Sequence, residues 1–424
     1  MLKPTLLALA VGMFTTQALA ETLVLNADAA LDVKSGKLIT PATLIIEDNR
    51  IVSIGKPTKK ALPADAKVID LSGHTLLPGL FDMHVHLTSD AHVHGYKRLQ
   101  RTTQRAAITG VMNARRTLDA GFTSVRNLGA AGYADIALRD AIYDGDVPGP
   151  RIFAAGPSLG ITGGHCDNNL LTHEHKVVAE GVADGPWAVR AKVRENIKYG
   201  ADVIKYCATG GVLSKGTKVG AQQYSLEEMQ ALVDEAHLRG LTVAAHAHGT
   251  EGIKSAIKAG VDSVEHVSFL DDDAILLAKK QGTYFSMDIY NTEYILSEGE
   301  KAGILAESLD KERVVGGTQR ESFRRAVKAG VNMVFGSDAG VYPHGDNGKQ
   351  FSRMVKFGMS ELQALQAATI NAATLLKRAD QLGSLDAGKL ADVIAVKGNP
   401  LKDISTMENV PLVIKDGKIE VNKL

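Results

Sequence analysis

The stretch HLRGLTVAAHAHGTEGIKSAIKAGVDSVEH, residues 237–266, contains one local phrase twice. In each copy a helix-like lead is followed by a glycine, Gly240 or Gly260, and then by an apolar run that ends on His246 or His266. A glycine suits the end of a helix, and a short apolar run rich in small and β-branched residues suits a buried strand. The stretch therefore predicts a strand, a helix and a second strand in succession.

The same phrase recurs along most of the chain. Further runs lie in LLPGLFDMHVH (76–86), LDAGFTSVRN (118–127), PRIFAAG (150–156), IKYGADVIKY (197–206), AKKQGTYFSMD (278–288) and VKAGVNMVFGSD (327–338). Eight strands that alternate with helices predict an α/β fold, a (β/α)8 TIM barrel spanning residues 76–382. A doubly wound open sheet is the alternative, but it would not need so many ionisable residues at strand ends.

The two ends of the chain differ from the barrel. Residues 21–75 and 383–424 read as short strands separated by turns, and we expect them to meet in a small β-sandwich beside the barrel. Residues 1–20 have an early Lys3, an apolar centre, and Ala18 and Ala20 in an A-x-A pattern. This pattern predicts a secretory signal peptide cleaved after Ala20, hence a periplasmic or secreted protein. A membrane anchor is the alternative, although the apolar run is short for a span.

The composition excludes some classes of partner. The 424 residues carry a formal net charge of zero, which gives no reason to expect nucleic acid or an acidic membrane surface as partner. After signal cleavage we expect no membrane segment. Only two cysteines are present, Cys166 and Cys207, so there is no disulfide framework, and the sequence does not decide whether the two are paired or free.

The strand-ending residues are the candidates for chemistry, because functional side chains of such barrels lie at the carboxyl ends of the strands. His84 and His86 end the first run, and in a strand residues i and i+2 face the same way, so both can reach one metal ion. A second pair, His92 and His94, lies in a polar stretch and is interpreted as loop histidines.

Further strand ends complete a metal site. His246, His266 and Asp338 each end a later run, and imidazoles with a carboxylate suit Zn²⁺ or a similar divalent ion. Lys205 is the exception, because a buried ammonium is costly and cannot ligate a metal. One alternative for Lys205 is an unmodified amine of depressed pKa that serves as a base or a Schiff-base nucleophile.

The order His-x-His, Lys, His, His, Asp resembles the amidohydrolase superfamily over essentially the whole mature chain. VIKYCATGG (203–211), ITGGHCDN (161–168) and VAAHAHGTEGIKSAIKAGVDSVEH (243–266) are similar to its imidazolonepropionase-like branch, which includes Xaa-Pro dipeptidases (prolidases), with ochratoxin-hydrolysing amidases in the same neighbourhood.

This resemblance implies roles for the strand-ending residues. Two divalent ions, most simply Zn²⁺, are expected, with His84, His86 and Asp338 on one and His246 and His266 on the other. Lys205, carboxylated by CO₂, would bridge them.

The proton transfers and substrate contacts need further residues. Asp338 is expected to move a proton from water to the leaving amine, and His248 to hydrogen-bond the carbonyl or the developing oxyanion. His165 and Tyr206 are nominated as substrate contacts, as is Arg126, for which an ion pair at the barrel mouth is the alternative. Glu265 and Asp262 are interpreted as structural, and His344 and Asp346 stay unassigned.

The expected function is hydrolysis of the amide bond to a C-terminal amino acid in a dipeptide or N-acyl amino acid, as in a carboxypeptidase, a dipeptidase or an ochratoxin A hydrolase. A cyclic amidase, a lactonase or a phosphotriesterase is the first alternative. The second is a non-catalytic binding protein, which would be expected to lose some of the ligands. A homo-oligomer is compatible with the resemblance, but no surface signal in the sequence shows one.

Overall fold

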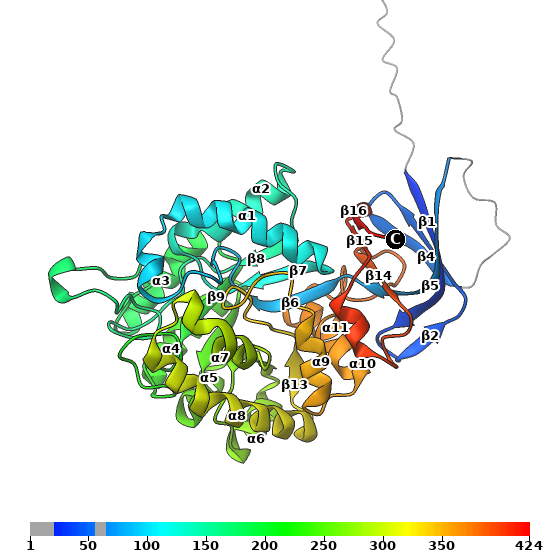
Figure 1. The fold of residues 1–424 in the computed structure, drawn as a ribbon. Coiled ribbons are helices and arrows are strands. Elements are labelled where there is room, and N and C mark those ends of the chain that lie inside the picture. Colours follow the sequence, from blue (N-terminus) through cyan, green and yellow to red (C-terminus); the bar gives the residue numbers. More distant parts are fainter. Residues whose placement is uncertain (1–20, 56–64) are drawn as a thin grey trace, which may run out of the picture.

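The computed structural model describes residues 21–55 and 65–424. These residues form a larger part of strands and helices and a smaller part of strands, which lie side by side (Figure 1). The predicted signal peptide lies outside the described residues. No helix within the described ranges combines the length and the apolarity that a membrane span requires.

Eight parallel strands form the inner layer of the larger part. They are β6 (Leu80–Val85), β7 (Phe122–Asn127), β8 (Arg151–Ala154), β9 (Val203–Cys207), β10 (Thr242–Ala247), β11 (Ser263–His266), β12 (Tyr284–Ser286) and β13 (Asn332–Val334). They pair in chain order as two sheets, β6 to β8 and β9 to β13. These are the eight strands that the repeated phrase predicts.

Backbone hydrogen bonds cross both gaps between these sheets. The Met83 N–H donates to the Phe335 carbonyl at 2.8 Å, and the Leu159 N–H donates to the Lys205 carbonyl at 2.8 Å. The strands therefore follow one another in a barrel-like ring, although they do not form one continuous closed sheet. This arrangement confirms the predicted α/β fold class.

The helices form the outer layer around the strands (Figure 1). They are α1 (Thr103–Asp119), α2 (Ala134–Tyr143), α3 (Pro186–Lys198), α4 (Leu226–Leu238), α5 (Thr250–Ala259), α6 (Asp272–Gln281), α7 (Asn291–Ala302), α8 (Ala306–Ala329), α9 (Lys349–Lys356), α10 (Glu361–Ala367) and α11 (Ile370–Leu375). Gly260 and Gly330 end α5 and α8 with φ values of 92° and 67°, a conformation that costs glycine little. Apolar side chains of strands and helices, such as Val243 and Ile253, share one buried core.

Both chain ends build the smaller part, as the sequence predicts. Its strands are β1 (Thr22–Asp32), β2 (Lys37–Ile39), β3 (Ala42–Glu47), β4 (Arg50–Gly55), β5 (Lys67–Pro78), β14 (Val393–Lys397), β15 (Leu412–Lys415) and β16 (Lys418–Asn422). They are ordered β16-β15-β14-β5-β1-β3-β4, with β2 beside β1. A separate apolar cluster that includes Leu25, Leu44, Val393 and Leu412 fills this β-sandwich. The long β5 joins the strands of the two chain ends, because it pairs with both β1 and β14.

Candidate metal centre

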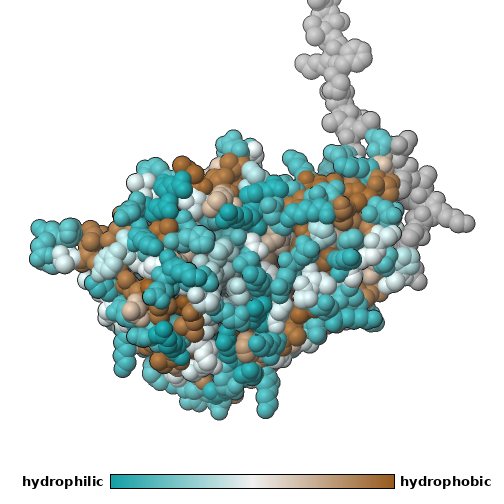
Figure 2. Space-filling view, in the orientation of Figure 1, coloured by the Kyte–Doolittle hydropathy of each residue, from teal (hydrophilic) through white to brown (hydrophobic). Residues whose placement is uncertain are grey.

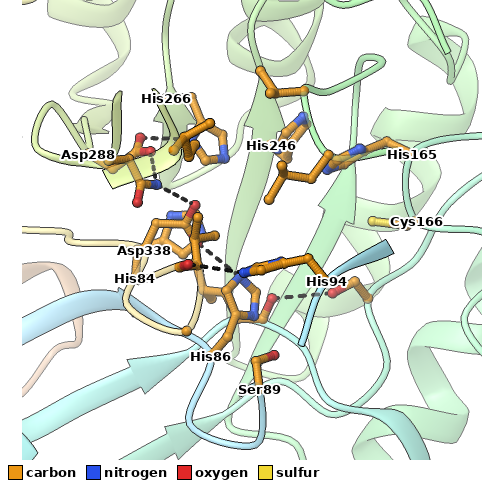
Figure 3. A pocket seen from close by; sticks show the side chains of 18 of the residues that line it. His84, His86, Ser89, His94, His165, Cys166, His246, His266, Asp288 and Asp338 are labelled. Carbon is orange, nitrogen blue, oxygen red and sulfur yellow. Dashed lines mark hydrogen bonds and ion pairs between the residues drawn. The ribbon is translucent and has the colours of Figure 1, made fainter. Parts of the chain in front are cut away.

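Six strand-end residues of the sequence prediction line one cavity: His84, His86, Lys205, His246, His266 and Asp338. The cavity has a volume of about 340 Å³, and Figure 3 shows the labelled histidines and aspartates converging on it from different strands. Strand alternation explains why His84 and His86 both face the cavity, because residues two positions apart in a strand point to the same side. The order of the strands around the ring thus brings together residues as distant in the sequence as His84 and Asp338.

One group of possible ligands consists of His84, His86 and Asp338. The Asp338 Oδ1 atom lies 3.4 Å from His84 Nε2 and 3.2 Å from His86 Nε2. One ligand atom from each of the three residues falls within 4.8 Å of the others, so a single ion could contact all three. This is the set that the resemblance assigns to one ion.

The second group consists of His246, His248 and His266, whose ligand atoms likewise lie within 4.8 Å of one another. The ring of His248 lies 4.8 Å from that of His266 and 4.7 Å from that of His246. The sequence analysis assigns only His246 and His266 to the second ion and expects His248 to contact the substrate. In the structure, the ligand atom of His248 lies as close to those of His246 and His266 as these two lie to each other, within 4.8 Å.

Hydrogen-bond partners fix the orientation of these histidine rings. His266 Nδ1 lies 2.7 Å from Asp288 Oδ1, and His248 Nδ1 lies 2.7 Å from Ser268 Oγ. The contact with Asp288 leaves the opposite nitrogen of His266, Nε2, available to a metal, and a carboxylate in this position is usual behind metal-binding histidines. The Asp288 carboxylate also accepts hydrogen bonds from Gln319 and Asn291.

Two residues of the site have left-handed backbone conformations. His266 has φ 71° and Asp338 has φ 58°, values that residues other than glycine adopt at a cost. At His266 this turn ends the strand alternation. Both Glu265, whose carboxylate lies 3.2 Å from His84 Nδ1, and His266, whose ring lies 5.1 Å from that of His84, therefore reach the inner side of the barrel.

Burial keeps several of these imidazoles neutral, which is the form that binds metal. Burial and the nearby Lys205 ammonium lower the pKa of His84 to about 4. Burial, with neighbouring histidines, places the pKa values of His246 and His248 well below the ordinary range. For Asp338, burial raises the pKa, but its interactions with His84 and its hydrogen bond with His86 lower the pKa by more, so the net shift is downward and the carboxylate is ionised.

Lys205 is buried in the middle of β9, with 3% of its surface exposed. Within the described part of the chain, its ammonium has no ion pair. Burial, the largest cause, lowers the pKa of Lys205 to about 8 although Glu265 and Asp338 oppose this shift. Most of the amine is therefore still protonated at pH 7, but its neutral fraction is much larger than that of an ordinary lysine.

The donor set fits divalent metal ions. Among the described residues, the buried His246 Nε2 has no hydrogen-bond partner, and such an unsatisfied atom is costly unless something binds it. Neutral imidazole nitrogens with one carboxylate match the ligand preferences of Zn²⁺. The residues present thus suit the group that the sequence pattern predicts.

His165 lies on the cavity wall, as the sequence analysis expects of a substrate contact. Its ring stacks on that of His246 at 4.1 Å, and its Nδ1 lies 2.8 Å from Ser214 Oγ. Burial is the largest cause that lowers the pKa of His165, to about 3.

Tyr206 does not reach the cavity. It follows Lys205 directly on β9, so strand alternation turns its side chain to the opposite face, where it is fully buried near Tyr224. The nomination of Tyr206 as a substrate contact is therefore corrected.

Arg126 does not line the cavity either, and its nomination as a substrate contact is also corrected. Its side chain is fully buried, donates to the Met83 carbonyl and to Ser263 Oγ, and pairs with Glu265 at 2.8 Å. Burial alone would raise the pKa of Glu265, but the positive charge of Arg126 and the hydrogen bond with His84 outweigh burial and hold this pKa below its usual range. Arg126 therefore fixes Glu265, which in turn contacts His84.

Removing this buried cation is expected to destabilise the fold. Arg126→Met leaves the buried Glu265 carboxylate without its cationic partner, which should lower the free energy of unfolding by about 3–5 kcal/mol. Arg324→Met is the control, because Arg324 pairs with Glu321 at the surface, and such a pair contributes under about 1 kcal/mol. Urea unfolding of both variants checks this, and equal losses would contradict the role given to Arg126.

Several cavity residues were missed by the sequence analysis. His94, interpreted there as a loop histidine, lines the cavity with its Nε2 3.2 Å from the Val341 carbonyl. The helical residues Asn291 and Glu312 also line it, and burial is the main cause that raises the pKa of Glu312 to about 7. The cysteines left open by the sequence form a disulfide, Cys166–Cys207, in the cavity wall.

The chain is similar to known amide hydrolases over most of its length. A sequence model described as the amidohydrolase family matches residues 75–419. The chain is 34% identical to an ochratoxinase of Aspergillus niger over 411 residues, covering 91% of this chain and 84% of that protein. It is 26% identical to an imidazolonepropionase of Micrococcus luteus over 392 residues, covering 84% and 88% of the two chains.

The fold is similar to a solved structure as well. The crystal structure of a Xaa-Pro dipeptidase with bound methionine in its active site superposes with a TM-score of 0.89 at 41% identity, covering 94% of this chain and 99% of that chain. Both the sequence and the fold comparisons thus lead to the same group of enzymes.

Proposed function

The chain belongs to the amidohydrolase family, and on this premise we propose that it is a binuclear metal hydrolase that releases the C-terminal amino acid of a dipeptide or an N-acyl amino acid. The membership confirms the resemblance seen in the sequence, and with ochratoxinase and dipeptidase relatives it makes the protein a hydrolase of amide bonds. The observation that carries the proposal is that one cavity contains two groups of residues able to hold a metal ion and a buried lysine.

The proposal assigns each group to one ion. His84, His86 and Asp338 would hold the first, His246 and His266 the second, and Lys205 would contact both after carboxylation. In that modification the neutral Lys205 amine forms a bond to the carbon of CO₂ and loses one proton, which gives an anionic carbamate. Divalent ions bound there would lower the pKa of water and polarise the scissile carbonyl.

The remaining steps belong to the side chains. Asp338, ionised and facing the cavity, would accept a proton from the attacking water and deliver it to the nitrogen of the leaving amine. If the Ser268 hydroxyl donates to His248 Nδ1, the proton of this neutral ring is on Nε2 and can be donated to the carbonyl oxygen of the substrate.

The cavity wall supports an anionic substrate with an apolar group. Arg98 lines the cavity and brings positive charge that favours a carboxylate, whereas the neighbouring Arg101 pairs with Asp90 at 3.1 Å. Apolar side chains that include Val212, Leu213 and Ile295 line another part of it. A volume of about 340 Å³ is suitable for a small molecule of dipeptide size.

The substrate assignment is tested with a panel of amides. We expect free amino acid to appear from Xaa-Phe, Xaa-Leu or Xaa-Pro dipeptides, from their N-acetyl counterparts, or from ochratoxin A. The kcat/KM of the best apolar substrate should exceed that of Xaa-Asp at least about 10-fold, because even one methylene group in an apolar pocket changes kcat/KM by about that factor. Lactones and phosphotriesters are the controls. Turnover confined to those controls would contradict the proposed amidase function.

We further propose that the protein is exported and works in the periplasm or outside the cell. Residues 1–20 have the pattern of a cleavable signal, and the Cys166–Cys207 disulfide suits an oxidising compartment. Amino-terminal sequencing of the protein from the extracytoplasmic fraction should begin at Glu21. A chain that retains Met1 and stays in the cytoplasm would contradict this assignment.

A further inference from the structure

The Cys166–Cys207 disulfide lies in the wall of the reaction cavity. It joins residues 41 positions apart, with Cα atoms 5.9 Å from each other, and both cysteines line the cavity. Cys207 is the last residue of β9, two positions after Lys205, and therefore faces the same side of the strand. The other half-cystine belongs to the segment between β8 and α3.

That segment also carries His165. The residue precedes Cys166 directly, and its ring stacks on His246 with an interplanar angle of 21°. The surroundings are tight, because a Cβ atom added at Gly211 would lie 2.4 Å from the His165 ring, and one at Gly160 would lie 2.7 Å from the Cys166 Cβ. The position of the His165 ring in the cavity therefore depends on the position of the segment between β8 and α3.

Beyond the disulfide, the segment projects away from the body of the protein (Figure 1), and Figure 2 shows apolar surface on this projection. Val177 and Val178 are 43% and 60% exposed there. The backbone N–H of His165 donates to Gln223 Oε1 at 3.0 Å, a bond that is only partly buried. Leu159 and Leu170 of this segment are buried, but residues 171–180 include no buried side chain. The projection itself therefore belongs to the part of a fold that opens most easily.

We propose that the Cys166–Cys207 disulfide is a positioning element that holds His165 against His246 and so shapes the part of the cavity that receives the substrate. The inference rests on the proposed amidase function. It predicts that opening the disulfide raises KM roughly 10-fold, since displacement of a binding group by about 1 Å can cost up to about 100-fold. The turnover number should change much less, because Asp338 lies on a different strand end.

The experiment uses the complete chain loaded with Zn²⁺ and a phosphine as reductant. The phosphine takes an oxygen from water and becomes a phosphine oxide, while the disulfide gains two electrons and two protons and becomes two thiols. Thiol titration should count no thiols before the treatment and two after it. KM and kcat are then measured on the amide found best in the panel.

The Cys166→Ser/Cys207→Ser double variant is the matched control. It should have the raised KM without any reductant, and the phosphine should not raise it further, which separates opening of the disulfide from loss of metal. His165→Ala in the oxidised protein should raise KM comparably. A reduced protein with two thiols and an unchanged KM would overturn the inference, as would a protein isolated from the periplasm with two free thiols.

A second readout needs no substrate. Hydrogen–deuterium exchange of residues 158–183 should accelerate after reduction, while exchange in β10 and β11 stays slow. If no amide is hydrolysed, this exchange still reports whether the disulfide holds the segment, so a failure of the proposed function is distinguished from a failure of the inference. Unchanged exchange after full reduction would overturn the inference.

Discussion

Lys205→Ala should abolish amide hydrolysis almost completely and reduce the bound metal at the same time. Lys205 lies buried in the cavity that contains both groups of candidate metal ligands, and burial lowers the pKa of its amine to about 8. Without the proposed carbamate, the two proposed ions would have no shared anionic ligand. Loss of a residue that only orients a metal ligand costs about 10–100-fold, so loss of this ligand should cost more than about 100-fold in kcat/KM.

A chemical rescue makes this expectation specific. Short carboxylates such as acetate or propionate can enter the space left by the Lys205 side chain and supply two oxygen atoms, so they should restore part of the activity of Lys205→Ala. Lys258→Ala, a change at the surface of α5, is the control and should leave activity and metal content unchanged. Full activity in Lys205→Ala without added carboxylate would contradict the carbamate assignment.

Asp338→Asn should lower kcat by about 10²–10⁴-fold, the range for a general acid–base group, while KM changes little. The substitution keeps the shape of the side chain and its contact with Asn291, whose Nδ2 lies 2.9 Å from Asp338 Oδ2. It removes the negative charge and the ability to accept a proton. Measurement at saturating Zn²⁺ separates the loss of proton transfer from weaker metal binding.

Asp288→Asn is the matched control for this prediction. The Asp288 carboxylate is buried in the same cavity wall, and one of its oxygens lies within 4.8 Å of ligand atoms of His266 and Asp338. Its hydrogen-bond contact is with His266 Nδ1, so we expect it to orient that ring and not to transfer the proton. Its loss should weaken metal binding about 10–100-fold and should be largely corrected by added metal. If added Zn²⁺ restored Asp338→Asn as fully as Asp288→Asn, Asp338 would be a metal ligand without a role in proton transfer.

The repeated phrase was enough to predict the fold and the residues that converge on the cavity. A strand ending on an ionisable residue fixes both where that residue lies in the barrel and which way it points, so His84, His86, Lys205, His246 and Asp338 could be brought together from the sequence. Tyr206 could have been excluded by the same alternation, since it follows an inward-facing lysine.

Other parts of the site depend on packing that a single sequence does not specify. Arg126 ends a strand like the others, but its partner Glu265 lies 139 residues away and is turned inward by the backbone at His266. Asn291 and Glu312 reach the cavity from helices, whose rotation about their axes depends on tertiary contacts. The Cys166–Cys207 pairing likewise requires the position of a segment that belongs to neither a strand nor a helix.

Metal analysis by mass spectrometry, on protein purified with Zn²⁺ and bicarbonate and then freed of excess ions, tests the central proposal most directly. The proposed site predicts about two divalent ions per chain, and fewer in a variant that lacks His84 and His86 or one that lacks His246 and His266. Amide hydrolysis should disappear with the ions and return with them. A metal-free protein that still hydrolyses the amide at full rate would contradict the binuclear mechanism.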